Sequence, residues 1–337
     1  MSQSLHECAP ARDAGLFGCS PSPGETKVTI VGVPWEPTVS YGRGCSQTPS
    51  AIVPVSHQLD LFEPFLQRDF GEETTLVPLE GDWETANRRC IQLAEPIIEQ
   101  GGRLDAQLER NLEEINRTSA ALNQALNRQV DTLLAAGQIV GVLGGDHASP
   151  FGTIQAHAKH FPGMGILHVD AHHDLRKAYE GFVYSHASIM FNILEQVSFN
   201  GPLVSVGIRD FSTQEWRLAQ DHPKVITHYD RDISTALLAG TPWADRAAAI
   251  LDPLPEHVYV SFDIDGLNPN LCPNTGTPVP GGLQFQQATY LLEQIALSGR
   301  QLVGFDLCEV SPGQDDWDLN VGSRILHKLA AVSCYRR

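Results

Sequence analysis

The amino-acid sequence predicts an α/β fold built on a mostly parallel β-sheet. From residue 27 onward, short apolar runs rich in β-branched residues alternate with longer segments of helical pattern. This alternation is typical of βαβ units. Eight apolar runs are predicted strands: KVTIVGV (27–33), TTLVPL (74–79), QIVGVL (138–143), MGILHVD (164–170), PLVSVGI (202–208), VITHY (225–229), HVYVSFDID (257–265) and QLVGFDL (301–307).

Two helical segments between these strands define the predicted layout further. The segment TPSAIVPVSHQLDLF has Thr48 as its expected N-cap and Pro49 in its first turn, although Pro54 interrupts the pattern. Residues 103–136 form the longest helical pattern, for which we expect an amphipathic crossover helix rather than a partner-binding one. No boundary inside the chain demands a second domain. We therefore expect a loose N-terminal arm over residues 1–25 and one catalytic domain over residues 26–337.

Charge and cysteine content restrict the partners and the compartment. The formal net charge of −17 argues against nucleic acid or an anionic membrane as a partner, because both need clustered Lys and Arg. No apolar run of about 18 residues and no signal-peptide pattern is present, so we expect no membrane span. The seven cysteines are scattered and contain no C-x-x-C pair. This pattern is typical of reduced thiols, and we expect a cytoplasmic protein.

Acidic and imidazole side chains follow three of the predicted strands. They occur in VLGGDHAS, in HVDAHHD and in SFDIDG. Ligands of an open parallel sheet bind beyond the carboxyl ends of its strands, and residues two apart in an extended segment face the same side. We therefore expect one cleft to receive the side chains of His147, Asp170, His172, Asp174, Asp263 and Asp265.

Such a cluster would repel itself strongly without a counter-charge, because each carboxylate raises the pKa of its neighbours. Two divalent cations would balance the four carboxylates. Mixed oxygen and nitrogen ligands suit Mn²⁺ and related first-row ions, and the lack of nearby thiolates argues against a structural zinc site. Each residue alone has a simpler interpretation, as a turn, a cap or a packed histidine. The combination at three strand ends favours a metal site.

Three blocks of the sequence resemble the signature blocks of the arginase/agmatinase (ureohydrolase) family. They are GGDHAS, DAHHD and SFDIDGLNPNLCPNTGTPVPGG, and the resemblance extends from about residue 28 onward. It implies a three-layer α/β/α sandwich on an eight-stranded parallel sheet. It also implies one ion held by His147, Asp170, Asp174 and Asp263, and a second held by His172, Asp170, Asp263 and Asp265, so that Asp170 and Asp263 bridge the two.

The same resemblance implies two further catalytic residues and a reaction. His186 in YSHASIM matches the histidine that passes protons to the leaving amine, and Glu309 in FDLCEVSP matches the glutamate that orients the guanidinium group. The implied reaction is hydrolysis of a guanidino group to urea and an amine, with water activated by the two ions. Family members commonly form trimers or hexamers, so a homo-oligomer is expected.

The substrate is the least determined part of the prediction. LRKAYEGFVYSHAS lacks the Asn and Ser residues with which arginases read an α-amino acid, whereas VSVGIRD resembles the agmatinases. An agmatinase-like activity on a guanidino substrate other than arginine is therefore expected. The alternatives are guanidine hydrolysis with Ni²⁺ in place of Mn²⁺, which bulky Trp35 or Trp317 would favour by closing the cleft, guanidinobutyrase and formiminoglutamase.

Four residues are predicted to shape the substrate pocket: Arg176, Tyr41, Asn274 and Thr275. If Arg176 lines the pocket it favours an anionic tail, and if it pairs with Glu180 or Asp210 outside the pocket it has no such effect.

Three polar residues near the cluster are not expected to bind metal. Two alternative functions are also considered. We expect Asp146 to support the metal site indirectly, and His168 and His173 to point away from it into packing. A two-metal phosphoesterase would need Arg176 and Arg209 to clamp phosphate oxygens. A non-catalytic binding module of the same fold would be expected to lack some of the ligands, and the sequence has all six.

Overall fold

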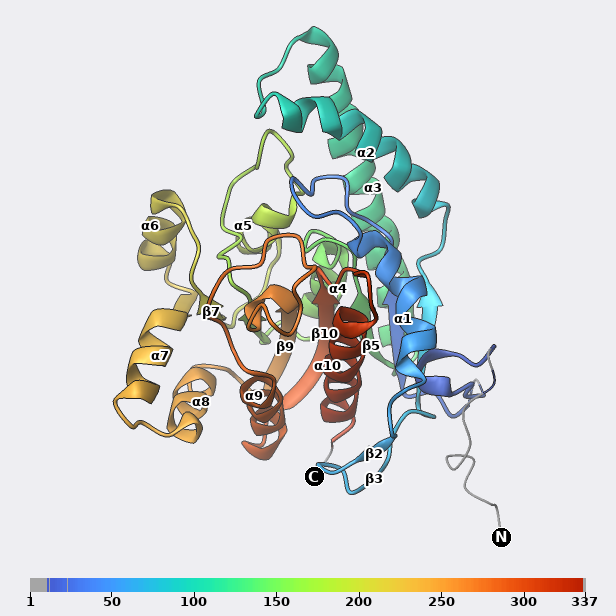
Figure 1. The fold of residues 1–337 in the computed structure, drawn as a ribbon, viewed down its shortest axis with the longest axis vertical. Helices are drawn as coiled ribbons and strands as arrows, with labels where there is room; N and C mark the ends of the chain where they lie inside the picture. Colours follow the sequence, from blue (N-terminus) through green and yellow to red (C-terminus); the bar gives the residue numbers. More distant parts are fainter. Residues whose placement is uncertain (1–10, 12, 23, 336–337) are drawn as a thin grey trace.

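The central element of the protein is an eight-stranded sheet in which all neighbouring strands are parallel (Figure 1). The computed structural model describes residues 11, 13–22 and 24–335. The strand order is β4-β1-β5-β10-β9-β6-β7-β8. The eight predicted strands are confirmed as β1 (Val28–Gly32), β4 (Thr74–Pro78), β5 (Ile139–Leu143), β6 (Gly165–Val169), β7 (Leu203–Ile208), β8 (Val225–Tyr229), β9 (His257–Asp263) and β10 (Gln301–Cys308).

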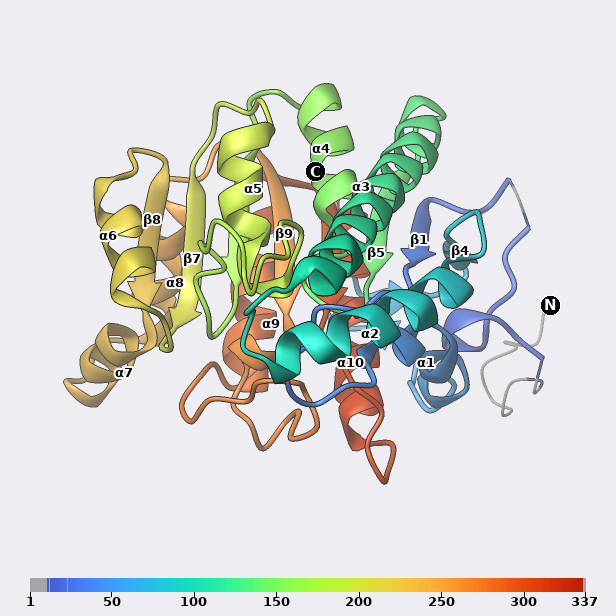
Figure 2. The same ribbon diagram turned by 90° about the horizontal axis from the view of Figure 1, so that it is seen from above.

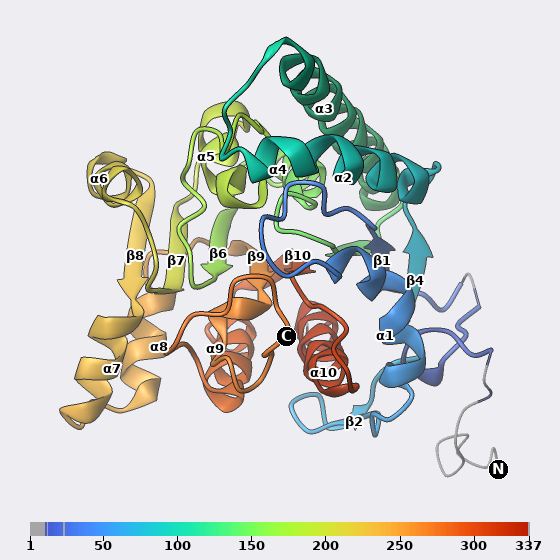
Figure 3. The same ribbon diagram turned by 45° about the horizontal axis from the view of Figure 1, so that its top comes forward.

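Helices cover both faces of this sheet, which confirms the three-layer α/β/α sandwich (Figure 3). One face packs against α1 (Thr48–Ser56), α7 (Asp230–Leu238), α8 (Trp243–Leu251), α9 (Phe285–Leu297) and α10 (Trp317–Ser333). The other packs against α2 (Trp83–Glu99), α3 (Ala106–Ala135), α4 (Phe151–His160), α5 (Ile189–Gln196) and α6 (Thr213–Asp221). A small antiparallel pair, β2 (Phe62–Glu63) and β3 (Arg68–Asp69), lies outside the sheet.

The predicted helices differ from the observed ones at both ends, most of all at the end of α1, which stops at Ser56 whereas the predicted segment runs to Phe62, the first residue of β2. The long pattern over residues 103–136 is confirmed as α3, which packs on α2, α4 and β5 as a crossover helix does (Figure 2). Helix α1 begins at Thr48 and its N-cap position is Gln47, because a short 3-10 turn runs directly into it. The Thr48 hydroxyl instead donates a hydrogen bond to the Val310 carbonyl. Pro54 lies inside α1 without ending it.

The expectation of a loose arm over residues 1–25 needs correction where the structure describes this segment. Residues 1–10, 12 and 23 lie outside the described part. Leu16 and Phe17 are buried in the core, and the Phe17 N–H donates to the Ser56 hydroxyl at 2.8 Å. Their apolar side chains therefore anchor this part of the N-terminal segment on α1.

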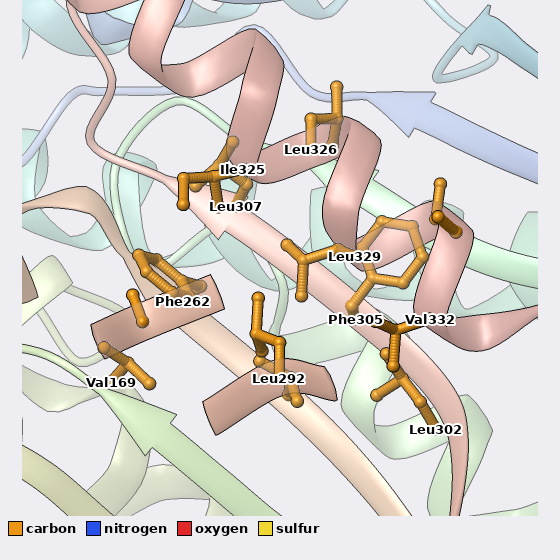
Figure 4. Packing of buried hydrophobic residues seen from close by; sticks show 14 of the residues in the cluster. Val169, Phe262, Leu292, Leu302, Phe305, Leu307, Ile325, Leu326, Leu329 and Val332 are labelled. Carbon is orange, nitrogen blue, oxygen red and sulfur yellow. The ribbon is translucent and has the colours of Figure 1, made fainter. Parts of the chain in front are cut away.

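The strands are buried because both faces of a parallel sheet are covered. Figure 4 shows the contact between β10 and α10, where Phe305 and Leu307 of the strand meet Ile325 and Leu329 of the helix. All four side chains are fully buried. This packing holds the central strands in place and so fixes the positions of the residues that follow them.

Two sequence expectations concern the whole chain. Among the described residues, no helix is long and apolar enough to cross a membrane. The six cysteines in the described part of the chain are free thiols, and Cys8 lies outside it.

We predict that Leu329→Ala lowers the free energy of unfolding by about 2–5 kcal/mol, because it leaves a cavity between α10 and the sheet. Urea denaturation followed by circular dichroism measures the change. Leu238→Ala, at a side chain that is 89% exposed at the end of α7, is the matched control and should change stability by less than about 0.5 kcal/mol. Equal effects of the two substitutions would contradict the assignment of Leu329 to the core.

Candidate metal centre

The candidate site lies at the carboxyl ends of four neighbouring strands, β5, β10, β9 and β6. His147 follows β5, Asp170 follows β6, Asp263 ends β9 and Glu309 follows β10. These strands are far apart in the sequence but adjacent in the sheet. Their ends therefore bring the predicted residues together without any long loop.

The six predicted ligands form one continuous cluster around two histidine nitrogens. His147 Nδ1 lies 3.0 Å from Asp170 Oδ2, 3.1 Å from Asp174 Oδ2 and 3.4 Å from Asp263 Oδ2. His172 Nδ1 lies 3.0 Å from Asp265 Oδ2 and 3.5 Å from Asp170 Oδ1. The two oxygens of Asp170 thus face different histidines, an arrangement that would allow this carboxylate to bridge two ions.

Burial raises the free energy of the ionised carboxylates in this cluster. Burial, together with Asp265 and Asp170, raises the pKa of Asp263 well above its ordinary value. Burial and Asp170 raise the pKa of Asp174 to about 6. Burial opposes protonation of His172, but Asp265 and Asp170 outweigh it and raise the pKa of this histidine to about 12. Positive charge from bound protons or cations is therefore needed to stabilise these carboxylates together.

The donor set fits divalent cations. Its atoms are carboxylate oxygens and imidazole nitrogens, which suit Mn²⁺ and related ions. Two groups of side chains have their ligand atoms within 4.8 Å of one another and share Asp170: His147, His168, Asp170 and Asp174 in the first, and Asp170, His172 and Asp265 in the second. Two ions sharing Asp170 would fit these two groups.

A hydrogen-bonded pair behind His147 orients its ring. His147 Nε2 lies 2.9 Å from the Ser261 hydroxyl, which donates to Asp306 Oδ1 at 3.0 Å. With Nε2 occupied in this way, Nδ1 faces the carboxylates. The sequence reasoning missed Ser261 and Asp306. A signal existed, because Ser261 shares a strand face with Asp263, but only the register of β9 with β10 pairs it with Asp306.

The three residues given supporting places have different outcomes. Asp146 accepts hydrogen bonds from the Thr38 hydroxyl and from a backbone N–H, so it braces the loop and does not touch the cluster. The prediction for His168 is wrong: its Nε2 lies 2.8 Å from Asp170 Oδ2. Residues 168 and 170 are two apart in one strand and therefore share a face. His173 packs against Phe211 as predicted.

His186 and Glu309 both line the cavity beside the cluster. The Nδ1 atom of His186 lies 3.3 Å from the Thr38 hydroxyl, and burial lowers the pKa of this histidine to about 4. Glu309 accepts a hydrogen bond from the His147 N–H at 2.9 Å, and its backbone has a φ of 61°. Burial and Asp146 raise the pKa of Glu309 well above its ordinary value. The structure thus brings both predicted catalytic residues to the cluster.

A cavity of about 150 Å³ opens onto the cluster. Its lining consists of Ser40, Tyr41, His147, His172, Asp174, Arg176, Tyr179, His186, Ala187, Asp210, Phe211, Glu215, Asp263, Thr277 and Glu309. Of the four predicted pocket residues, Tyr41 and Arg176 are present. Asn274 and Thr275 are absent from the lining, because Asn274 bonds to Asp318 and the Thr275 hydroxyl donates to the Glu309 carbonyl.

The two tryptophans considered as a possible lid do not line the cavity. Trp35 is 1% exposed and packs edge-on against Trp83 in the core beneath α2. The Trp317 indole donates to the Asn270 carbonyl instead. The exposed ring at the mouth of the cavity belongs to Tyr41, which is 76% exposed.

Arg176 lines the cavity and is also paired, but with a partner that the sequence did not indicate. Its Nε lies 3.5 Å from Glu215 Oε2, and its guanidinium carbon lies 5.1 Å from the centre of the Tyr179 ring. The suggested partners Glu180 and Asp210 are not the ones observed. The carboxylate of Asp210 is exposed in the cavity, and no hydrogen bond or ion pair to it is seen among the described residues.

Arg209, the other arginine considered for phosphate binding, has a structural role. Its guanidinium donates to the carbonyls of Gly207, Val279, Asp265 and Leu267. These bonds tie the end of β7 to the loops that follow β9. Because its donors are used in this way, Arg209 does not serve as a phosphate clamp.

The fold and the cluster together define an α/β protein with a site suited to two metal ions, and comparison with known proteins identifies its family. A family model described as "Arginase family" matches residues 26–331. The N(1)-aminopropylagmatine ureohydrolase of Thermus thermophilus is 32% identical over 316 residues, 93% of each chain. The agmatinase of Bacillus anthracis is 30% identical over 312 residues, 88% of each.

A solved structure supports the fold. Proclavaminate amidino hydrolase from Streptomyces clavuligerus superposes with a TM-score of 0.72 and 21% identity, covering 97% of this chain and 98% of its own. The chain belongs to the Arginase family.

We predict that Asp263→Asn lowers the number of Mn²⁺ ions bound per chain from two to fewer than one, because Asp263 is expected to bridge both ions. Equilibrium dialysis with elemental analysis measures the ratio. Asp252→Asn, an exposed carboxylate after α8, is the control and should leave two ions bound. Retention of two ions by Asp263→Asn would contradict the bridging role.

Proposed function

We propose that this protein hydrolyses the guanidino group of an agmatine-type substrate, a linear alkylguanidine with an amine on its tail, to urea and an amine. The observation that carries this proposal is a cavity whose lining combines the buried His/Asp cluster with the exposed carboxylate of Asp210, for which no hydrogen bond or ion pair is seen among the described residues. The reaction class follows from membership of the Arginase family, so the chain is a hydrolase acting on guanidino C–N bonds.

The charges of the residues around Asp210 support a cationic tail. Glu215 offsets the charge of Arg176, and no hydrogen bond or ion pair to the Asp210 carboxylate is seen in the described part of the chain. A substrate ammonium would restore the balance. The relatives named agmatinase and N(1)-aminopropylagmatine ureohydrolase are consistent with this chemistry. A second candidate, 4-guanidinobutyrate, rests on the two terminal nitrogens of Arg176, for which no bond is seen in the described structure.

We assign the two ions to the residues inferred from the sequence: His147, Asp170, Asp174 and Asp263 for one, and His172, Asp170, Asp263 and Asp265 for the other. We propose Mn²⁺ rather than Ni²⁺, because carboxylate oxygens outnumber imidazole nitrogens in this set. When bound, such ions supply positive charge that favours deprotonation of water and polarises the substrate.

The residues of the chain itself have separate tasks in the proposed reaction. The Glu309 carboxylate lines the cavity next to His147 and, when ionised, accepts N–H bonds from the guanidinium group, which holds the planar carbon toward the cluster. His186 has Nδ1 engaged by Thr38, so its Nε2 is the atom that passes a proton to the leaving nitrogen. Water attacks the guanidino carbon, the C–N bond to the alkyl chain breaks, and urea and the protonated amine leave.

We also propose that the protein forms a homo-oligomer, and this proposal rests only on the resemblance to its family.

The substrate proposal is tested with four guanidino compounds that differ only in the tail: agmatine, butylguanidine, 4-guanidinobutyrate and guanidine. We expect agmatine to have the highest kcat/KM when urea release is measured with Mn²⁺ and, separately, with Ni²⁺. Asp210→Asn should raise KM for agmatine about fivefold and leave kcat unchanged, since one exposed charge pair contributes about 1 kcal/mol. KM for butylguanidine should not change.

Two outcomes would contradict different parts of this proposal. Absence of urea from every compound with either metal would contradict the reaction. A higher kcat/KM for 4-guanidinobutyrate than for agmatine, together with no effect of Asp210→Asn, would contradict the proposed cationic tail. It would leave the proposed reaction unaffected.

We also predict that His186→Ala lowers kcat by about 10²–10⁴-fold with two ions still bound, because it removes proton transfer and no ligand. Steady-state urea release and metal analysis on the same sample measure both quantities. His160→Ala, at a histidine paired with Asp131 on the surface, is the control and should retain wild-type kcat. An unchanged kcat in His186→Ala would exclude the proton-transfer role.

A further inference from the structure

Glu215 makes contacts in two directions, and its position on α6 explains only the first. Toward its own helix it forms a capping box: its Oε2 accepts the Ser212 N–H at 2.9 Å, and the Ser212 hydroxyl accepts the Glu215 N–H. This arrangement satisfies free N–H groups at the start of a helix. A capping glutamate normally needs no further partner, and most lie on the surface, yet Glu215 is only 4% exposed.

The second direction leads to the turn that carries a proposed metal ligand. Glu215 Oε1 accepts the backbone N–H of Leu175 at 3.3 Å, and Oε2 lies 3.5 Å from Arg176 Nε. Leu175 follows Asp174 directly. No other acceptor for the Leu175 N–H is seen in the described structure, so a side chain 40 residues away provides what the local backbone does not.

The turn needs such a restraint because its backbone conformation is unfavourable. Asp174 has a φ of 53°, in the left-handed region that costs a non-glycine residue about 1 kcal/mol or more. Contacts from outside must therefore hold the turn. The neighbouring backbone bonds join it to the segment that contains His186: the Arg176 N–H donates to the Ala187 carbonyl at 3.1 Å, and the Phe191 N–H donates to the Asp174 carbonyl at 3.1 Å.

We propose that Glu215 is a positioning residue for the metal centre, with its carboxylate holding the Asp174–Arg176 turn against the N-terminus of α6. Its Oε2 accepts from Ser212 at the start of the helix and also lies beside Arg176, whereas its Oε1 accepts the Leu175 N–H of the turn. This turn determines the position of the Asp174 carboxylate and of the Arg176 side chain that lines the cavity. It also determines the position of the segment that contains His186. This role rests on the proposed function, since it assumes that Asp174 binds metal.

Glutamine at position 215 separates the two tasks. Glutamine is a normal capping-box residue, so its single side-chain oxygen can keep the local bond to Ser212. Its NH₂ group then faces the Leu175 N–H, donor against donor, and the turn loses its restraint. Ser212→Ala does the reverse. It removes the capping hydroxyl and the hydrogen bond that this hydroxyl donates to Glu215 Oε2, while Oε2 can keep the Ser212 N–H and Oε1 can still accept the Leu175 N–H.

The decisive experiment measures Mn²⁺ binding to metal-free protein by calorimetry, alongside the melting temperature. We expect Glu215→Gln to weaken Mn²⁺ binding about 10–100-fold, the usual effect of removing a group that orients a ligand. We expect Ser212→Ala to lower the melting temperature by about 2 °C and to change Mn²⁺ affinity by less than about twofold.

Gln287→Ala provides a matched control for loss of a capping side chain. Gln287 occupies the same position in the capping box of α9, outside the lining of the cavity. It should affect melting as Ser212→Ala does and leave Mn²⁺ affinity unchanged.

Wild-type Mn²⁺ affinity in Glu215→Gln, measured on folded protein, would overturn the proposal. If Glu215→Gln does not fold, Glu215→Ala is measured in its place, because it removes the donor–donor conflict but still leaves the Leu175 N–H unpaired. Wild-type Mn²⁺ affinity in folded Glu215→Ala would likewise overturn the proposal. Binding is measured without substrate, so this result is independent of whether agmatine is turned over. Failure of the wild-type protein to bind Mn²⁺ at all would instead contradict the proposed metal function.

Discussion

Repulsion among buried carboxylates is the constraint on which the rest of this site depends. Asp170, Asp174, Asp263 and Asp265 are each at most 5% exposed and lie around two histidines. Desolvation and repulsion both oppose ionisation of Asp174 and Asp263, whose pKa values are raised. The sheet can impose this proximity because its central strands are held by tightly packed helices, so the free energy of the core outweighs the local cost. A pair of divalent cations would remove the repulsion, so that the cost of holding the carboxylates together would contribute to metal affinity.

The backbone next to the cluster also adopts locally unfavourable conformations that tertiary contacts hold in place. Asp174 and Glu309 both have positive φ values, 53° and 61°. Each is fixed from outside: the Asp174 carbonyl accepts from Phe191, and the Glu309 N–H donates to the Gly145 carbonyl at 2.9 Å. Unfavourable conformations of this kind persist where the surroundings determine them, and they concentrate at functional sites. Here they turn the side chains of two strand ends into the cavity.

The sequence was sufficient for those features that depend on local pattern. Alternating apolar runs and helical segments predicted all eight strands, and residues that directly follow strands predicted the cluster. It was insufficient wherever a residue acts across elements. The motif S-x-x-E at 212–215 indicates a helix start, but nothing local indicates that the Glu215 carboxylate also reaches Leu175. The error at His168 had a different origin, since strand periodicity places it on the face of Asp170.

The residues that line the cavity come from two parts of the fold. Some lie at or directly after strands of the sheet, as Asp263 and Glu309 do, and others, such as Tyr41, Arg176 and Asp210, lie outside the strands. Loop residues can change without disturbing the sheet. Arg176 is the exception among them, because Glu215 joins it to the turn that carries Asp174. On the proposed function, the tail that the substrate carries can therefore be altered at the side chains of Asp210 or Tyr41 while the cluster is kept, and Asp210 supplies the negative charge that a cationic tail would neutralise.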